Sequence, residues 1–438
     1  GMNAVQLLQF YIASFVARTQ SLMLVVKHNR PVYFTTFTIL LVVFKFLYSW
    51  SALVLLIPVV LYIVLHCINT DDFPHIYYMK HSPFAAKVIM NTPQLTKPYK
   101  CPAAIAEGHV MTIYSALTNC TFSCSFTRTE VTCEDGGVCA IETLDDEFSD
   151  KASICFVVPG ITGDEKSKHV KKIVEVARRN GYRPVVFVKR GFSGLKLKNP
   201  VITSACAVDD IYKALEVVHA KYPLAHINII GASLGATQVI RLSYVYSKKL
   251  LDLDVCAIAA VCPVWGISAL HMSPLYSSGF VEYFKKIVND NIQVYREAKD
   301  KDGKPLFNID AIMAAREMRE METALIVPMY GYSSVEAYYW DVEQWFQNLP
   351  CTRIPTFTIN SFDDPVCNDQ SYSYVRVKAI AGFSPFVLSS YTQHGGHCIY
   401  TESFDINALS YANISSIKFF QTVEAMKESG ELAQYVAD

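Results

Sequence analysis

Residues 225–246, AHINIIGASLGATQVIRLSYVY, decide the fold of this chain. Residues 225–230 are an apolar run rich in isoleucine, and residues 234–246 have helical spacing. Between them stands Gly-Ala-Ser-Leu-Gly, residues 231–235, with one glycine on either side of Ser233. Strand, tight turn and helix in this order predict a turn that presents the Ser233 hydroxyl above a sheet, because side chains at the glycine positions would clash. The plainer alternative is a packing turn in which the serine caps the helix.

The alternation of apolar runs with helical patterns continues on both sides of this stretch. Strands separated by helices predict βαβ units, and therefore a mostly parallel sheet with right-handed crossovers and helices on both faces. The predicted strands are residues 153–158, 183–188, 225–230, 255–261, 354–359 and 386–390, and the predicted helices include residues 166–179, 208–219 and 234–246.

Two segments depart from this alternation. Residues 110–142, around Asp135-Gly136-Gly137, predict an antiparallel hairpin at the edge of the sheet. From residue 263 to about residue 347 the alternation stops, in a segment with amphipathic stretches and many aromatic side chains. This segment is too long for a loop, so we expect a helical cap inserted over one edge of the sheet.

The start of the chain predicts a membrane anchor. We expect an anchor region at residues 1–70, a linker and edge segment at 71–109, and an α/β domain at 110–438. The main apolar stretch, residues 46–66, would form about 31 Å of helix, close to the hydrocarbon thickness of a bilayer. Basic residues precede this stretch, which favours a cytoplasmic N-terminus and a single-pass type II anchor in the endoplasmic reticulum or plasma membrane. A second apolar run at residues 32–44 leaves a two-span hairpin open, and with it the side on which the α/β domain lies.

Composition excludes several classes of function. Of the 438 residues, 51% are hydrophobic and 18% are charged, which excludes a disordered chain. The net charge of −1 gives no support for nucleic-acid binding as the main activity. The 13 cysteines are scattered and lack the spacing of a zinc site, so the sequence predicts no metal and no organic cofactor. Cys133 and Cys139 flank the predicted hairpin turn, either as a disulfide or as two thiols.

A serine hydroxyl is a poor nucleophile unless a base removes its proton, and an acid then orients that base. In hydrolases with this kind of turn, the acid and the histidine follow the serine in that order. Asp364 follows the predicted strand at 354–359, and His397 follows the one at 386–390, both at the carboxyl ends of strands where catalytic groups gather. The candidate catalytic residues are therefore Ser233, Asp364 and His397, with Asp363 and His394 as second choices.

The same chemistry needs hydrogen-bond donors for an oxyanion. Pro159-Gly-Ile-Thr-Gly163 follows the first parallel strand, so its backbone amides face the same edge as Ser233. We expect the amides of Ile161 and Leu234 to form the oxyanion hole, with Thr162 as the alternative to Ile161.

These residues and three further motifs resemble one branch of the α/β-hydrolases. The motifs are Arg190-Gly-Phe-Ser-Gly194, Tyr330-Gly-Tyr-Ser-Ser334 and Glu336-Ala-Tyr-Tyr339. The branch holds bacterial YheT-like esterases, yeast medium-chain ethyl-ester synthases, and animal membrane-anchored monoacylglycerol lipases and phospholipases. The resemblance runs from about residue 110 to residue 421. It implies an α/β-hydrolase fold, a Ser233–Asp364–His397 triad, hydrolysis of lipid-like esters, and an N-terminal anchor.

The chain departs from this branch at two places. Cys398-Ile-Tyr400 stands where the family tends to have Leu-Gly-Phe, and Lys189 stands where it often has Asn. Because the first change lines the site beside the base, the preferred substrate does not transfer from the family.

The reaction expected from these residues is hydrolysis of acylglycerol or phospholipid acyl esters through an acyl-enzyme. The aromatic cap would supply the apolar acyl pocket, and the partners would be a lipid ester and the bilayer. Two alternatives remain at this point. An acyltransferase or ester synthase would use the same triad with an alcohol in place of water, and a lipid- or sterol-binding protein would use the fold without catalysis.

Overall fold

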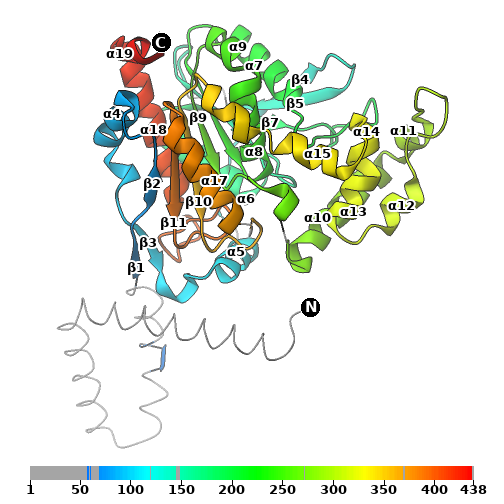
Figure 1. Ribbon diagram of the computed structural model, residues 1–438, viewed down its shortest axis with the longest axis horizontal. Coiled ribbons are helices and arrows are strands. Elements are labelled where there is room, and N and C mark those ends of the chain that lie inside the picture. Colours follow the sequence, from blue (N-terminus) through cyan, green and yellow to red (C-terminus); the bar gives the residue numbers. More distant parts are fainter. Residues whose placement is uncertain are drawn as a thin grey trace, which may run out of the picture. The chain divides into compact units, whose positions relative to one another are not determined.

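The computed structural model of the chain describes residues 57–58, 60, 69–118, 120–144, 148–270, 272–367 and 370–436 (Figure 1). Apart from residues 57, 58 and 60, the predicted membrane-spanning stretch at 46–66 lies outside the described residues. Within the described part, no helix is both long enough and apolar enough to cross a bilayer. The chain divides into two compact units, and the second, residues 71–101 and 105–438, contains the central sheet and the candidate site.

The strands of the second unit form a twisted, mostly parallel sheet. Strands β6 to β11 run parallel to one another, whereas β2, β4 and β5 are antiparallel at the two edges. The order across this nine-stranded sheet is β2-β11-β10-β9-β8-β6-β7-β5-β4. The strands of the chain are β1 (Asn69–Asp72), β2 (His75–Tyr77), β3 (Tyr99–Pro102), β4 (Thr127–Thr132), β5 (Val138–Thr143), β6 (Ile154–Val158), β7 (Arg183–Val188), β8 (Ile227–Ala232), β9 (Val255–Val261), β10 (Thr356–Ser361) and β11 (Val387–Thr392).

Helices cover both faces of this sheet. Residues of α4, α6 and α18 bury their apolar sides on one face, and residues of α7, α8 and α17 do so on the other. In α6, apolar side chains recur at helical spacing from Val170 to Ala177 and are all buried, which explains both the helix and its orientation. The helices around the sheet are α4 (Pro83–Asn91), η1 (Pro93–Leu95), η2 (Ala103–Ile105), α5 (Gly108–Leu117), α6 (Lys168–Arg179), α7 (Asp209–Lys221), α8 (Leu234–Val245), α9 (Ser247–Asp252), α17 (Gln370–Phe383), α18 (Tyr411–Glu428) and α19 (Glu431–Val436).

The segment after β9 is helical and has its own core. Its buried aromatic and aliphatic side chains, such as Phe284 and Tyr338, pack together with Phe192 and Leu197 from the loop after β7. Figure 1 draws most of this segment in yellow-green to yellow. Its elements are η3 (Ile267–Ala269), α10 (Pro274–Asp290), α11 (Ile292–Glu297), α12 (Ile309–Ala314), α13 (Met318–Met321), the π-helical turn η4 (Glu322–Ile326), α14 (Val327–Tyr330), α15 (Val335–Val342), α16 (Trp345–Asn348) and η5 (Leu349–Cys351).

The structure corrects the predicted hairpin at residues 110–142. Its first part is a helix, α5, which begins where the side chain of Glu107 accepts a hydrogen bond from the amide of Val110. The hairpin is confined to β4 and β5, where Cys133 and Cys139 are free thiols with their sulfurs 3.7 Å apart. The apolar content of residues 108–117 fits either element, and the Glu107 cap favours the helix.

The connectivity and strand order described above are those of an α/β-hydrolase. The parallel strands β6 to β11 alternate with helices, and the helical segment is inserted between β9 and β10. Because the strands are parallel, the loops after β6, β8, β10 and β11 meet at one edge of the sheet.

Candidate active site

Ser233 lies at the sharp turn between β8 and α8, where its backbone has φ 56° and ψ −121°. Such a strained conformation is typical of a serine presented at the end of a strand. A Cβ atom on Gly231 would lie 2.4 Å from the carbonyl oxygen of Gly235, and one on Gly235 would lie 2.1 Å from that of Val158. The turn therefore requires glycine at both positions, as the sequence pattern predicts.

The imidazole of His397 contacts the hydroxyl of Ser233. His397 lies in the loop after β11, and its Nε2 is 2.8 Å from the Oγ atom of Ser233. This distance allows direct transfer of the serine proton to the ring. The backbone amide of His397 donates to Oγ1 of Thr112 at 3.0 Å, so α5 holds the histidine loop in place.

The carboxylate of Asp364 orients this imidazole from the opposite side. Its two oxygens lie 2.9 Å and 3.1 Å from Nδ1 of His397, and its side chain is only 1% exposed. The same carboxylate accepts hydrogen bonds from the backbone amides of Val366 and Cys367, each at 2.9 Å. These bonds fix the carboxylate, which in turn keeps the ring proton on Nδ1 and leaves Nε2 to accept from the serine.

The environment of His397 makes it a stronger base. Burial by itself would lower the pKa of His397, since it disfavours the charged ring. The charge of Asp364 and the hydrogen bond to it outweigh burial, and they raise the pKa of His397 well above its usual range. A raised pKa strengthens the tendency of the imidazole to take up the serine proton.

The second-choice residues pair with each other. Nδ1 of His394 lies 3.3 Å from a carboxylate oxygen of Asp363, and the other oxygen of Asp363 accepts from the amide of Gly396 at 3.0 Å. The amide of His394 donates to the carboxylate of Asp72 at 2.8 Å. Asp363 and His394 therefore support the loop that carries His397 and are not in hydrogen-bond contact with Ser233.

The turn after β6 lies against Ser233. A Cβ atom on Gly160 would lie 3.1 Å from that of Ser233, and Ile161 lines the same cavities as the serine. Among the described residues, neither the amide of Ile161 nor that of Leu234 donates to a main-chain carbonyl or to a side chain. Both amides are thus available for an oxyanion, and their assignment to an oxyanion hole stays a prediction.

A buried lysine braces this turn. Nζ of Lys189 donates to the carbonyl oxygen of Gly160 and, at 3.0 Å, to that of Gly163. Lys189 is only 1% exposed, and burial lowers its pKa to about 7. The side chain also lies over the ring of Phe192, with Nζ 4.3 Å from the ring centroid. Lys189 therefore fixes the shape of the turn that carries the Ile161 amide.

Two cavities meet at Ser233. The first, of about 410 Å³, extends under the helical segment, and the second, of about 770 Å³, extends toward α5 and α6. Both are lined by Ile161, Ser233, Phe280 and Val366, so a bound ester could place one part on each side of the serine. The first cavity is lined largely by apolar and aromatic side chains of the helical segment, including Leu270, Met272, Met318, Tyr338 and Val342.

The first cavity also contains one buried acid. Glu322 lies in the π-helical turn, and burial raises its pKa to about 7. Its carboxyl group accepts a hydrogen bond of 2.5 Å from the hydroxyl of Tyr339. A π-helical turn inside a helix is often found at a functional site, and this one places Glu322 in the wall of the cavity.

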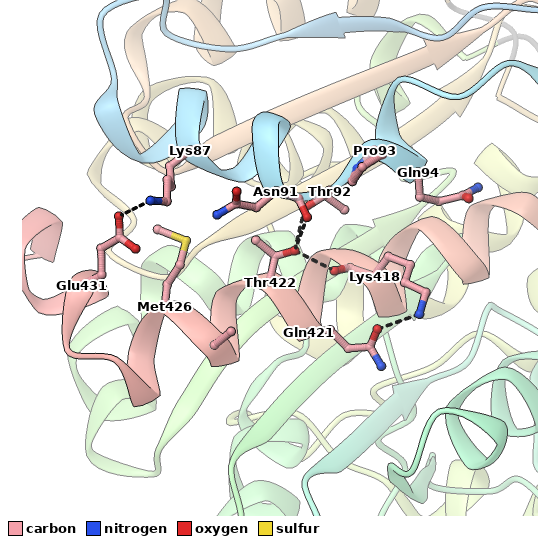
Figure 2. Close-up of a pocket in the computed structure, with 11 residues that line it drawn as sticks. Lys87, Asn91, Thr92, Pro93, Gln94, Lys418, Gln421, Thr422, Met426 and Glu431 are labelled. Carbon is pink, nitrogen blue, oxygen red and sulfur yellow. Dashed lines mark hydrogen bonds and ion pairs between the residues drawn. The ribbon is translucent and has the colours of Figure 1, made fainter.

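A third hollow, of about 420 Å³, lies between α4 and α18 and has a different character (Figure 2). Four of its polar side chains pair with one another, through an ion pair between Lys87 and Glu431 and a hydrogen bond between Thr92 and Thr422. None of its lining residues belongs to the Ser233 site.

Two residues that hold the site together were assigned no role from the sequence, although Lys189 was noted as a departure from the family pattern. Lys189 directly follows the apolar strand β7, at the same sheet edge as Ser233, and this position was a usable signal. Thr112 gave no such signal, because nothing in the sequence relates α5 to the histidine loop. Of the cysteines that lie near His397, Cys398 was recognised from the sequence as lining the site beside the base, whereas Cys262 and Cys367 were given no role.

No family model matches the chain. It is similar to Protein abhd-3.2 of Caenorhabditis elegans, with 28% identity over 373 residues, which are 81% of this chain and 92% of that protein. It is 26% identical to Phospholipase ABHD3 of Homo sapiens, covering 68% of this chain and 71% of that protein. It is 23% identical to Monoacylglycerol lipase ABHD2 of Homo sapiens, covering 78% of this chain and 84% of that protein.

Solved structures of esterases also resemble the chain, at low scores. Esterase Pf2001 from Pyrococcus furiosus has a TM-score of 0.40 and 17% identity, covering 71% of this chain and 95% of that chain. Esterase Est22 has a TM-score of 0.43 and 15% identity, covering 73% and 86%. Because these TM-scores are below 0.5, the fold assignment rests on the sheet topology and not on these structures. Taken with that topology, the similarity to the named lipases and phospholipases supports an α/β-hydrolase of the lipase and esterase type, and a carboxylic ester hydrolase.

Proposed function

We propose that this chain is a serine hydrolase that cleaves the acyl esters of lipid-like substrates. The observation that carries the proposal is the contact of Ser233 with His397, whose ring is in turn held by the buried carboxylate of Asp364. Ser233 is the nucleophile, His397 is the general base and acid, and Asp364 orients and stabilises the imidazole.

In the proposed reaction, Nε2 of His397 takes the proton of Ser233 as the Oγ atom attacks the ester carbonyl. The amides of Ile161 and Leu234 donate to the resulting oxyanion. The imidazolium then gives its proton to the leaving alcohol, the carbon–oxygen bond breaks, and the acyl group stays on Ser233. A water molecule attacks the acyl-enzyme with His397 as base, which releases the acid and restores the serine.

The cavities support a substrate with an acyl chain and a separate alcohol part. The cavity under the helical segment, which we propose as a cap at residues 263–347, offers the acyl chain an apolar wall. The cavity toward α5 and α6 is the larger one and takes the alcohol part. The relatives named as phospholipase and monoacylglycerol lipase support acylglycerol or phospholipid esters as the class.

We also propose that the chain is membrane-associated through residues 46–66. This proposal rests on the apolar sequence of that stretch, which is long enough to span a bilayer as a helix. If it is correct, the full chain stays with the membrane pellet after carbonate extraction, and a variant with several arginines in the stretch is released. Release of the unaltered chain would contradict it.

The proposed function is tested by product analysis with the full chain in detergent micelles. Monoacylglycerols, diacylglycerols and phospholipids are each incubated with the unaltered chain and with Ser233→Ala, and released fatty acid is measured. We expect release by the unaltered chain alone. An added short-chain alcohol distinguishes transfer from hydrolysis, because an ester synthase would then form the alkyl ester. Turnover of short water-soluble esters without any turnover of glycerolipids would contradict the lipid assignment.

A further inference from the structure

Two cysteines adjoin the imidazole of His397. Cys262 directly follows β9, and Cys398 directly follows His397 itself. The sulfur atoms of both cysteines and one ring nitrogen of His397 all lie within 4.8 Å of one another. The proposed ester hydrolysis uses neither thiol, so it does not explain why two cysteines lie beside the catalytic histidine.

The backbone holds both cysteines in an unusual conformation. Cys262 has φ 53° and Cys398 has φ 65°, in the left-handed region that residues with side chains rarely adopt. The amide of Cys262 donates to the carbonyl of Ile359 on β10 at 2.8 Å, and the amide of Cys398 points at the sulfur of Cys262 at 3.3 Å. The main chain at the ends of β9 and β10 and in the loop after β11 therefore holds the two sulfurs close together.

The cluster opens onto the larger cavity. His397 and Cys398 line the cavity of about 770 Å³, together with Ser233, whereas Cys262 is fully buried and does not line it. Because His397 and Cys398 line the cavity, a small ion can reach the cluster from it.

Two thiolates and one imidazole form a donor set that suits soft and borderline cations. Sulfur and nitrogen donors in this number bind zinc in a tetrahedral site that keeps one position open, and they select against magnesium and calcium. On binding, each thiol releases its proton to solvent, and the imidazole supplies a ring nitrogen lone pair. The ion would bind one ring nitrogen of His397, either Nε2, which accepts the serine proton, or Nδ1, which faces Asp364, and each of these bonds would interrupt the contacts of the base.

The two other groups with suitable spacing in the described residues are less favourable. In the group of His226, Asp254 and Cys256, the carboxylate already pairs with Lys427 and with the ring of His226. The group of Asp364, Cys367 and His397 uses the same ring, but its carboxylate is engaged by two backbone amides. In the cluster with Cys262 and Cys398, both thiols have only uncharged hydrogen-bond partners among the described residues, and His397 is the one donor that a charged group, Asp364, already holds.

We propose that Cys262, Cys398 and His397 form a binding site for a zinc-like cation that inhibits the enzyme by capturing its base. The inhibitory consequence rests on the proposed hydrolase function, whereas the binding itself does not. Occupation of the site disconnects His397 from Ser233 and stops proton transfer, and removal of the ion restores it.

Binding is tested with cadmium, whose thiolate complexes absorb in the ultraviolet. The full chain in detergent micelles, reduced and freed of metal, is titrated with cadmium chloride. We expect a cadmium–thiolate band for the unaltered chain and its loss in the double variant Cys262→Ser/Cys398→Ser. The exposed Cys351 and the pair Cys133 and Cys139 provide the matched controls, because their serine variants keep two thiols at His397 and should keep the band. Circular dichroism checks that each variant is folded, and single Cys→Ala variants replace any that is not.

Inhibition is tested with zinc chloride and a soluble ester, each variant being compared with its own metal-free rate. We expect the half-inhibiting zinc concentration to rise about 10-fold or more in the double variant, and chelator to restore the unaltered chain. A cadmium band that disappears only in the double variant, in a chain without esterase activity, would uphold the site and contradict the hydrolase function. Equal cadmium binding, or equal zinc inhibition, in the unaltered chain and the double variant would overturn the site.

Discussion

Nε2 of His397 lies 2.8 Å from Oγ of Ser233, although 164 residues separate the two in the sequence. They meet because β8 and β11 belong to the same parallel sheet and end at the same edge. The buried carboxylate of Asp364 completes the arrangement from the end of β10, which lies between β11 and β9 in the sheet.

Replacement of Asp364 by asparagine removes the charge that raises the pKa of His397. We expect kcat for a soluble ester to fall about 10⁴-fold, because the imidazole loses its orienting partner and takes the wrong tautomer. The pH dependence changes as well. The base must be unprotonated, so the rate of the unaltered chain rises with pH as His397 loses its proton, and this rise begins at lower pH in Asp364→Asn.

The neighbouring variant Asp363→Asn is the matched control for this pair. Asp363 contacts His394 and the amide of Gly396, and does not contact the His397 ring. We expect a far smaller loss of kcat and no shift of the rise in the pH profile. If kcat fell as far in Asp363→Asn as in Asp364→Asn, the assignment of Asp364 as the acid that orients His397 would be contradicted.

Replacement of Lys189 by methionine removes the brace of the turn after β6. Without donors to the carbonyls of Gly160 and Gly163, the amide of Ile161 is no longer held in position for the oxyanion. Because small displacements in an active site are costly, we expect kcat to fall by about 10²-fold with little change in KM. Lys249→Met, on α9 and away from the turn, is the control, and a similar loss in both variants would argue against a positioning role.

The turn at Ser233 has no room for a side chain at Gly235. A Cβ atom there would lie 2.1 Å from the carbonyl oxygen of Val158, so we expect Gly235→Ala to reduce the free energy of unfolding by about 3 kcal/mol or more. Gly279 in α10 is the control, because nothing lies within 4 Å of a Cβ atom at that position. Gly279→Ala should instead stabilise the protein by about 0.5–1 kcal/mol, through its higher helix propensity. Urea unfolding of both variants measures the difference.

The buried Glu322 makes the stability of the protein depend on pH. Its pKa in the folded chain is raised to about 7, whereas the unfolded chain releases the proton near the usual value of 4.5. Between these values the folded state binds the extra proton, so the free energy of unfolding falls as the pH rises from about 4.5 through 7. Glu322→Gln lacks this dependence. Urea titrations at pH 5 and pH 7.5 should therefore show a smaller difference for Glu322→Gln than for the unaltered chain, and equal differences would contradict the burial of an ionisable group there.

The central strands could be predicted from the sequence because they are buried on both faces and therefore appear as continuous apolar runs. The strands at 183–188 and 255–261 have the predicted bounds, since each is a buried apolar run between turn residues. The strand before Ser233 is shifted by two residues from the predicted range 225–230: it begins at Ile227 and ends at Ala232, because strand geometry persists up to the turn itself. The hydrophobic pattern alone does not predict this shift.

The parts that sequence reasoning did not reach depend on contacts between distant elements. The helix α5 was expected to be part of a hairpin, and its link to the histidine loop through Thr112 exists only in three dimensions. The choice of Asp364 over Asp363 was a guess from the loop pattern, and the contact that distinguishes them is the bond to His397. The proximity of Cys262 and Cys398 likewise depends on the left-handed backbone conformation of both residues, which no sequence pattern predicts.

The most direct test of the central claim is covalent labelling of the full chain with a fluorophosphonate probe, followed by identification of the labelled residue by mass spectrometry. An activated Ser233 predicts one modified serine at position 233, full labelling of the unaltered chain, and none of Ser233→Ala. Labelling should also be strongly slowed in His397→Ala, because the base is then missing. Equal labelling of the unaltered chain and Ser233→Ala, or a modified residue elsewhere, would contradict the assignment of Ser233 as the nucleophile.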